Sequence, residues 1–415
     1  MKKIFNILGP GLLYAGAAIG VSHLVQSTKA GALFNYDLII ILIVANILKY
    51  PFFEYGPRYA NATGKSLVDG YAMVGKWAVI LFAILSFGSM FILQAAVTVV
   101  TVSLMANIFN LTISLTFLSV IVLIISGVIL LVGKYSLLDK FIRFIIVLLS
   151  ISTIIAVFSA LGVDKVVEPD SLISFEWTRN ADIFFLIAFV GWMPAPIDVS
   201  VWSSLWGLAK TEELGYKPKL KEVLLEFRIG YISTALLAIA FVVLGALVMY
   251  GTGKTFSPKG PVFAGQLIEM YTTSIGNWSY WIISIAALTT MLSTTITVLD
   301  AYPRVLTSIY QNIFKKHAAK NESNLTVYWV LLLIAGTLVI IVFLAKSMGY
   351  MVNFATTLSF VTAPVLAWLN FKVVTDSHMP VDARPGRILK FISWLGIIFL
   401  IGFTLVYFYW IFFSA

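Results

Sequence analysis

Apolar stretches long enough to cross a lipid bilayer recur along the whole chain, and this feature constrains the fold more than any other. A membrane-spanning helix needs about 20 mostly apolar residues. Eleven stretches of roughly that length or more lie at about residues 7–33, 37–59, 77–109, 113–133, 136–162, 182–208, 223–251, 277–308, 325–346, 348–373 and 389–413. The strands of membrane β-barrels are shorter and alternate in polarity. The pattern therefore predicts an all-α membrane protein with about eleven transmembrane helices.

The composition excludes several other classes of protein. Charged residues make up 11% of the chain and hydrophobic residues 60%, whereas soluble domains carry about 25% charged residues. The chain has no cysteine, which excludes disulfide scaffolds, thiolate metal sites and thiol nucleophiles. No nucleophile, acid–base pair or phosphate loop is recognisable, so we expect neither an enzyme nor a cofactor. Met1-Lys2-Lys3 leads into an apolar segment without a cleavage pattern, so we expect no cleavable signal peptide.

Lysines and arginines are distributed unevenly over the loops between the apolar stretches. With the N-terminus in the cytoplasm, 22 of the 28 fall on the cytoplasmic side, Lys49 included, and 6 on the other side. Cytoplasmic loops carry such an excess, so we expect a multi-pass protein of the cell (inner) membrane with a cytoplasmic N-terminus and an external C-terminus. The net charge of +9 then reflects topology. We expect the lipid bilayer and a small inorganic ion or small solute as partners, no nucleic acid, and no evident protein partner.

Two of the apolar stretches carry helix breakers in their middle. Gly20 interrupts the first, and Pro194 and Pro196, which lack a backbone N–H, interrupt the sixth. Broken backbone at membrane depth is tolerated where it lines a cavity, and such a pair in two halves points to a transporter binding site. The two spans are five helices apart, an odd number, so the second half inserts upside down. We predict one domain, 1–415, with inverted five-helix repeats at 1–162 and 182–373 and an extra helix at 389–413.

Polar residues near these breaks are candidates for binding an ion. His23 lies beside the first break, where it can ligate a metal, handle protons or hydrogen-bond between helices. Met193 offers a thioether for soft metals, or packing alone. Asp198 can face the cavity or stabilise the N-terminus of the second half-helix. The hydroxyls of Ser293 and Thr294 can hold Na⁺, or bond to the backbone one turn back.

Two pairs of oppositely charged residues at i,i+4 spacing lie near the cytoplasmic ends of their spans. Glu54 and Arg58 belong to the second span, and Asp300 and Arg304 to the eighth. Because residues four apart share one face of a helix, we expect gate or structural ion pairs. Lys49 is placed near the same end as Glu54.

Several motifs resemble those of the Nramp family of divalent metal transporters. They are Gly9-Pro10-Gly11, Ala30-Gly31-Ala32-Leu33-Phe34-Asn35-Tyr36, Ala62-Thr63-Gly64-Lys65-Ser66-Leu67 and Met193-Pro194. The resemblance implies a LeuT-like fold, with the substrate held between the unwound first and sixth spans.

The chain departs from the family at the positions that the resemblance implies for substrate binding. The Asp-Pro-Gly-Asn motif of the first span reads Gly20-Val21-Ser22-His23, so a glycine replaces the carboxylate. In the sixth span, after Gly191-Trp192, the Met-Pro-His motif keeps Met193 and Pro194 but continues as Ala195, and a second histidine becomes Ser200. The acidic pair of the third span becomes Gln94 and Val97, and the region of Thr362 and Pro364 matches loosely.

Three functions remain open. The first is divalent metal transport by alternating access, without proton coupling, through an altered site of His23, Met193, backbone carbonyls and Asp198. The second is transport of a small organic solute or anion, with Na⁺ at Ser293 and Thr294. The third is a sensor or scaffold that keeps the fold without transporting.

Overall fold

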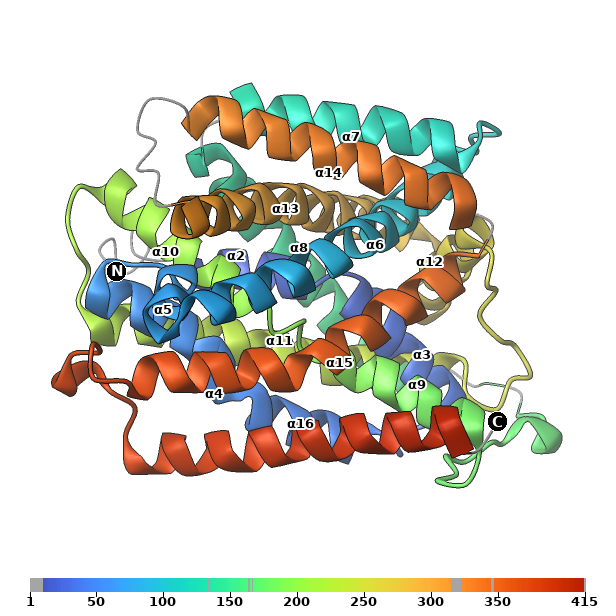
Figure 1. The fold of residues 1–415 in the computed structure, drawn as a ribbon. Helices are drawn as coiled ribbons and strands as arrows, with labels where there is room; N and C mark the ends of the chain where they lie inside the picture. The colour runs from blue at the N-terminus through green and yellow to red at the C-terminus, as the bar shows by residue number, and fades with distance from the viewer. Residues whose placement is uncertain are drawn as a thin grey trace.

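The computed structural model describes residues 10–132, 135–162, 165, 167–314, 322–344 and 347–413, and this part of the chain is built from helices and the loops between them (Figure 1). Uninterrupted spans are α4 (Ile39–Thr63), α6 (Lys76–Ile108), α7 (Leu115–Val132), α8 (Tyr135–Ala160), α11 (Leu220–Val248), α13 (Tyr280–Phe314), α14 (Glu322–Leu344), α15 (Met348–Thr375) and α16 (Arg387–Phe413). Eight of the helices are long and apolar enough to cross a membrane by themselves.

The first and sixth spans are each divided, as the breakers predict. The first consists of α2 (Pro10–Ala18), the π-helix η1 (Ser22–Ser27) and α3 (Thr28–Phe34), and the sixth of α9 (Asn180–Gly191) and α10 (Val199–Leu214). Together with α8 and the eight long helices, they make eleven spans. The prediction of an all-α membrane protein with about eleven transmembrane helices is confirmed.

Short helices connect the spans outside the bundle. They are α5 (Leu67–Val74), η2 (Pro169–Ser171), α12 (Gly260–Ile275), η3 (Asn277–Ser279) and η4 (Val381–Ala383). We call the end of the bundle where α2 begins the N-terminal side, and the other end, where α3 ends and α9 begins, the opposite side. In Figure 1 these are the left and the right of the picture.

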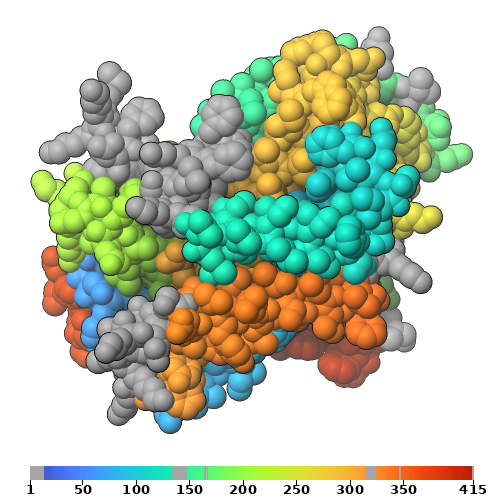
Figure 2. Space-filling model, turned by 90° about the horizontal axis from the view of Figure 1, so that it is seen from above, coloured from blue at the N-terminus to red at the C-terminus, as the bar shows by residue number. Residues whose placement is uncertain are grey.

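The helices differ in how deeply they lie within the bundle. In α13, 72% of the most apolar window is buried, against 22% in α14 and in α16. Figure 1 shows α16 along one edge and α7 with α14 along the other, and the view in Figure 2 shows α7 and α14 side by side on the surface. The exposed faces carry apolar side chains such as Phe343, Ile398 and Phe412, which suit contact with lipid.

Small residues bring the half-helices close to their neighbours. A Cβ atom added at Gly31 of α3 would lie 1.9 Å from the carbonyl oxygen of Val242 in α11, and one at Gly245 of α11 would lie 2.3 Å from the carbonyl oxygen of Thr28. The two backbones therefore touch, as small residues allow between membrane helices. This seam between α3 and α11 fixes the second half of the broken first span.

Candidate functional site

A small cavity lies between the two broken spans at the middle of the bundle. Its volume is about 20 Å³, and α6 and α13 complete its wall. The lining residues are Ala17, Ala18, Val21, Ser22, Leu93, Val97, Trp192, Pro196, Val199, Trp202, Thr294 and Val298. None of them is charged. The cavity is thus nearly apolar and has room for about one water molecule.

The end of α2 meets the hydroxyls of α13 at one wall of this cavity. A Cβ atom added at Gly20 would lie 2.7 Å from Thr294 Oγ1, so the glycine allows α13 to approach. Thr294 Oγ1 lies 3.3 Å from the carbonyl oxygens of both Gly16 and Ile19 and 3.1 Å from that of Thr290. The Ser293 hydroxyl is buried and has no hydrogen-bond partner in the described part of the chain. We call this set the α2-end oxygens.

His23 is buried and turns toward α11. Its Nδ1 lies 2.7 Å from Ser22 Oγ, and its Nε2 lies 2.9 Å from the carbonyl oxygen of Thr234. Because a carbonyl only accepts, Nε2 carries the proton and donates. Both ring nitrogens are engaged in this conformation, which is the arrangement of a histidine hydrogen-bonded between helices. As a metal ligand, His23 has to give up one of these bonds.

Met193 lies in the unwound segment of the sixth span, where its sulfur accepts a hydrogen bond of 3.7 Å from Ser27 Oγ. The thioether therefore bridges the two broken spans. Among the residues that the structure describes, no three His, Asp or Glu side chains gather as metal ligands.

Lys49 differs from its expected position near the cytoplasmic end of the second span. Its side chain is 0% exposed, and Nζ donates hydrogen bonds to the carbonyl oxygens of Val190 at 2.6 Å, Gly191 at 3.1 Å and Met193 at 3.1 Å. The ammonium lies at the break in the sixth span, not in a loop. Lys49 therefore does not belong among the 22 Lys and Arg residues assigned to the cytoplasmic side.

Asp198 is buried directly before α10, at the N-cap position. Its side chain makes no capping hydrogen bond, so the expected capping role is limited to the favourable charge at a helix N-terminus.

Of the remaining predicted site residues, Trp192 belongs to the lining of the cavity, and the others bond or pack elsewhere in the described part of the chain. Gln94 Nε2 donates to the carbonyl oxygen of Thr295 at 3.2 Å, and Trp192 Nε1 donates to Ser359 Oγ at 2.9 Å. Thr362 Oγ1 bonds within its own helix to the carbonyl oxygen of Ser359. A Cβ atom at Gly191 would lie 2.4 Å from the backbone of α15, and Ala195 is buried.

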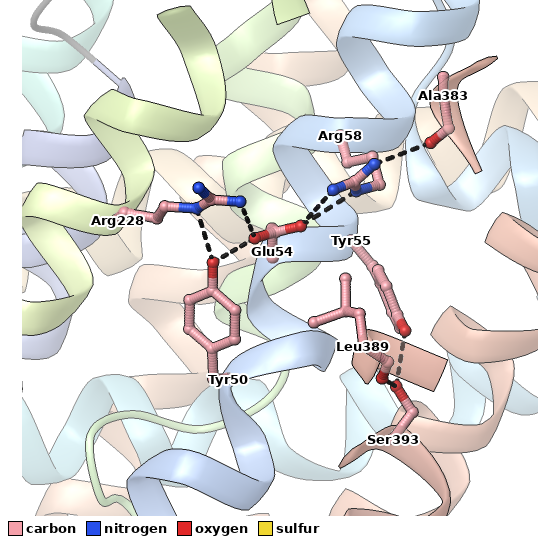
Figure 3. Close-up of polar contacts among 8 residues, drawn as sticks. All are labelled: Tyr50, Glu54, Tyr55, Arg58, Arg228, Ala383, Leu389 and Ser393. Atoms are coloured by element: carbon pink, nitrogen blue, oxygen red, sulfur yellow. Dashed lines mark hydrogen bonds and ion pairs between the residues drawn. The ribbon is translucent and has the colours of Figure 1, made fainter. Parts of the chain in front are cut away.

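The first i,i+4 ion pair, Glu54–Arg58, forms as the spacing predicts (Figure 3). Glu54 accepts from Arg58 at 2.5 Å, lies 3.5 Å from Arg228 of α11, and accepts from the Tyr50 hydroxyl. Arg58 also donates to the carbonyl oxygen of Ala383, 2.9 Å away, in the loop before α16. No pattern in the sequence links Arg228 to Glu54, because the two residues lie far apart in the chain. The cluster ties α4, α11 and this loop together.

The second pair joins α13 to the broken sixth span. Arg304 lies 2.8 Å from Asp300, and Asp300 accepts a hydrogen bond of 3.0 Å from Trp206 Nε1 of α10. Both pairs lie on the N-terminal side of the cavity.

A larger cavity, of about 550 Å³, opens on the opposite side between α3, α9 and α15. Phe34, Phe185 and Tyr350 line it, and Asn353 at its wall accepts a hydrogen bond of 3.4 Å from Gln26 of η1. We call it the vestibule. Two discontinuous helices around a central cavity, with ion pairs on one side and a vestibule on the other, define a secondary transporter.

Comparison with known proteins assigns the chain to a family. Residues 11–410 match the family described as "Natural resistance-associated macrophage protein-like", and the chain belongs to this Nramp family of transporters. An uncharacterized protein of Pasteurella multocida (strain Pm70) is 37% identical over 407 residues, which cover 97% of this chain and 92% of that protein.

Solved structures share the fold. A manganese transporter of Eremococcus coleocola superposes with a TM-score of 0.67 at 13% identity, covering 98% of this chain and 86% of its own. MhsT in complex with L-phenylalanine superposes with a TM-score of 0.62 at 15% identity, covering 96% of this chain and 98% of the MhsT chain. The LeuT-like fold of two inverted five-helix repeats and an extra helix is confirmed. The exact boundaries of the repeats stay predictions.

Proposed function

We propose that this protein moves a metal ion across the membrane by alternating access between the two broken spans, through an altered site and without proton coupling. The observation that carries the proposal is the central cavity, which both unwound segments line. Family membership supports a metal ion as the substrate. The manganese transporter with the same fold supports it as well.

The altered chemistry of the cavity defines what kind of metal site this is. A glycine lies where the family has its carboxylate, so the ion is held by neutral donors: the Met193 thioether, nearby hydroxyls and backbone carbonyls. Neutral oxygen donors alone bind divalent ions weakly, and a thioether favours softer metals. Gln94 and Val97 replace the acidic pair of the third span, which supports transport without protons.

The proposed orientation places the N-terminal side in the cytoplasm of a cell with an inner membrane and the vestibule outside. The excess of Lys and Arg in the loops of that side supports it. In this conformation the ion pairs close the cytoplasmic side, and the vestibule faces the exterior.

Calorimetric titration of the purified protein with Mn²⁺, Zn²⁺ and Mg²⁺ tests the metal site. The expected result is a saturable heat for at least one ion that weakens about tenfold in Met193→Leu, which keeps the volume and removes the sulfur. Met351→Leu, at a buried methionine of α15, is the matched control and should leave the titration unchanged. A titration without heat for any divalent ion contradicts the proposal.

A second candidate is a small organic solute or anion, transported with Na⁺. The α2-end oxygens favour it, because the carbonyls of Gly16, Ile19 and Thr290 surround the Thr294 hydroxyl, and the hydroxyl of the adjacent Ser293 lacks a partner in the described part of the chain. Oxygen donors of this kind suit a hard cation. The absence of charge from the cavity lining removes repulsion of an anion.

Thermal stability in NaCl against choline chloride tests the second candidate. Na⁺ should raise the melting temperature of the wild type but not of Thr294→Val, which lacks the hydroxyl. Thr289→Val is the control on the same helix, since Thr289 bonds only to its own helix, at Ile285 and Ala286. Equal melting temperatures of the wild type in both salts argue against Na⁺ binding.

A further inference from the structure

The half-helices α2 and α9 both end in the middle of the bundle, and their C-terminal ends contact different kinds of chemical group. The last carbonyl groups of any helix lack partners within the helix, and they carry a partial negative charge. At the end of α2 these carbonyls face hydroxyls. At the end of α9 they face the Lys49 ammonium of α4.

The geometry around Lys49 is that of a bound cation. Three carbonyl oxygens, of Val190, Gly191 and Met193, lie between 2.6 and 3.1 Å from Nζ. Carbonyls only accept, so three such bonds require three N–H groups, and only the ammonium form of lysine carries three. All three acceptors belong to the end of α9 and the unwound segment after it.

Among the residues that the structure describes, no acidic side chain pairs with Lys49. Lysine is almost never fully buried unless it is paired, and ionisable groups inside a membrane are costly. Glu54, five residues along the same helix, is already held by Arg58 and Arg228. The backbone carbonyls are therefore what holds the charge of Lys49.

We infer that the carbonyl oxygens of Val190, Gly191 and Met193 form a cation site, that the Lys49 ammonium fills it as a tethered cation that cannot dissociate, and that the emptied site takes a primary alkylammonium ion. In transporters of this architecture, the carbonyl ends of half-helices coordinate ions that bind and leave. Here the chain supplies its own cation at the sixth span. The inference goes beyond the proposed function and does not depend on which solute is moved.

Chemical rescue of Lys49→Ala tests the inference. Alanine removes Cγ, Cδ, Cε and Nζ, and n-propylammonium consists of the same three carbons and the same ammonium. The melting temperature of the purified protein is followed by tryptophan fluorescence while choline chloride is replaced by n-propylammonium chloride at constant ionic strength. Lys49→Ala should melt below the wild type and recover at least half of the difference, saturably, because binding to the folded state stabilises it.

Matched compounds and variants separate cation binding from the filling of a hole. n-Propanol has the same length without charge, and tetramethylammonium has the charge without N–H donors, so neither should rescue Lys49→Ala. Lys29→Ala, at a lysine of α3 that lies over the Phe263 ring, should not respond to n-propylammonium. Rescue by n-propanol as strong as that by n-propylammonium overturns the inference, and so does folded Lys49→Ala without saturable recovery.

Two further variants keep the inference testable if Lys49→Ala does not fold. Lys49→Met fills much of the space without charge and should melt well below the wild type, with no response to n-propylammonium. Lys49→Gln retains two N–H donors and should melt between Lys49→Met and the wild type. A Lys49→Met protein as stable as the wild type would show that the carbonyls need no cation. None of these assays uses a transported solute, so failed metal uptake would leave their outcome unaffected.

Discussion

The carboxylate of Glu54 lies between two arginines on the N-terminal side, and it is nearly inaccessible to solvent (Figure 3). Removing one partner of a buried ion pair costs about 3–5 kcal/mol, because the other charge stays buried. Arg58→Ala should lower the free energy of unfolding by about 3 kcal/mol, the lower end of this range, because Arg228 still pairs with Glu54. Denaturant unfolding in detergent measures this. The control is Lys254→Ala, from an ion pair whose side chains are exposed, which should change the stability by less than about 1 kcal/mol.

Gly20 and Thr294 should be coupled energetically. The methyl group of Gly20→Ala would lie 2.7 Å from Thr294 Oγ1, and such overpacking costs about 1–3 kcal/mol. In the Thr294→Ala background the same change should cost much less, because the obstructing atoms are gone. A double-mutant cycle measures the coupling. Additive effects of the two substitutions would mean that the close approach of α13 to Gly20 is absent in solution.

At the residue scale, the sequence predicts ion pairs better than burial depth. The i,i+4 spacing was enough for Glu54–Arg58 and Asp300–Arg304, because a helix fixes their separation. The prediction that Lys49 lies near the cytoplasmic end of the second span is wrong, although Lys49 is only five residues from Glu54, about 7.5 Å along the helix axis. That distance is the difference between the end of a span and its middle, and the apolar pattern does not resolve it. The acceptors of Lys49 are backbone atoms, which leave no mark in the sequence.

The two broken spans are the elements whose existence the sequence predicts most directly. Pro194 and Pro196 cannot both continue a helix, and Gly20 lies directly between α2 and the π-helix η1. The π-helix itself was not predicted, because its widened turn depends on packing against α3 and α11 rather than on a residue type. The groups that meet the two helix ends come from α4 and α13, far away in the chain.

The seam between α3 and α11 gives a prediction at the scale of elements. A methyl group at Gly31 would lie 1.9 Å from the backbone of Val242, and backbone cannot move aside as a side chain can. Gly31→Ala should therefore force the helices apart and destabilise the protein by at least about 2 kcal/mol. Gly402→Ala in α16, where nothing lies within 4 Å of the added atom, is the control. A melting temperature of Gly31→Ala equal to that of the control would contradict the close contact.

The described part of the molecule carries the Glu54–Arg58 and Asp300–Arg304 ion pairs on the N-terminal side and the vestibule on the opposite side. The chain has no cysteine, so a single introduced thiol reports on access. Asn353→Cys, at the vestibule, should react readily with a membrane-impermeant thiol reagent. Adding Arg58→Ala should slow this reaction, because weakening one gate shifts the population toward the state open on that side.

The control for this access experiment is Tyr216→Cys, at an exposed residue between α10 and α11 on the N-terminal side. Its reactivity in detergent should stay the same with and without Arg58→Ala. Unchanged labelling of Asn353→Cys in the Arg58→Ala background would indicate that the two sides are not coupled.

Fold class, helix number and family follow from the sequence, because apolar length and breakers are local signals. The substrate does not follow in the same way, since the chain differs from the family at the broken spans, where Val21 and Ser22 line the cavity, and at Val97 of α6, which lines it as well. The fold supports transport, and the uncharged lining of the cavity supports the proposal of an altered metal site.

Uptake of Mn²⁺ and Zn²⁺ into proteoliposomes that contain a pH-sensitive dye tests the central claim most directly. We predict saturable uptake of at least one of these ions by the wild type, no acidification of the lumen that tracks it, and loss of uptake in Val21→Trp, which fills the central cavity. Folded wild-type protein that takes up neither ion would contradict metal transport. Acidification in proportion to the metal taken up would contradict transport without protons.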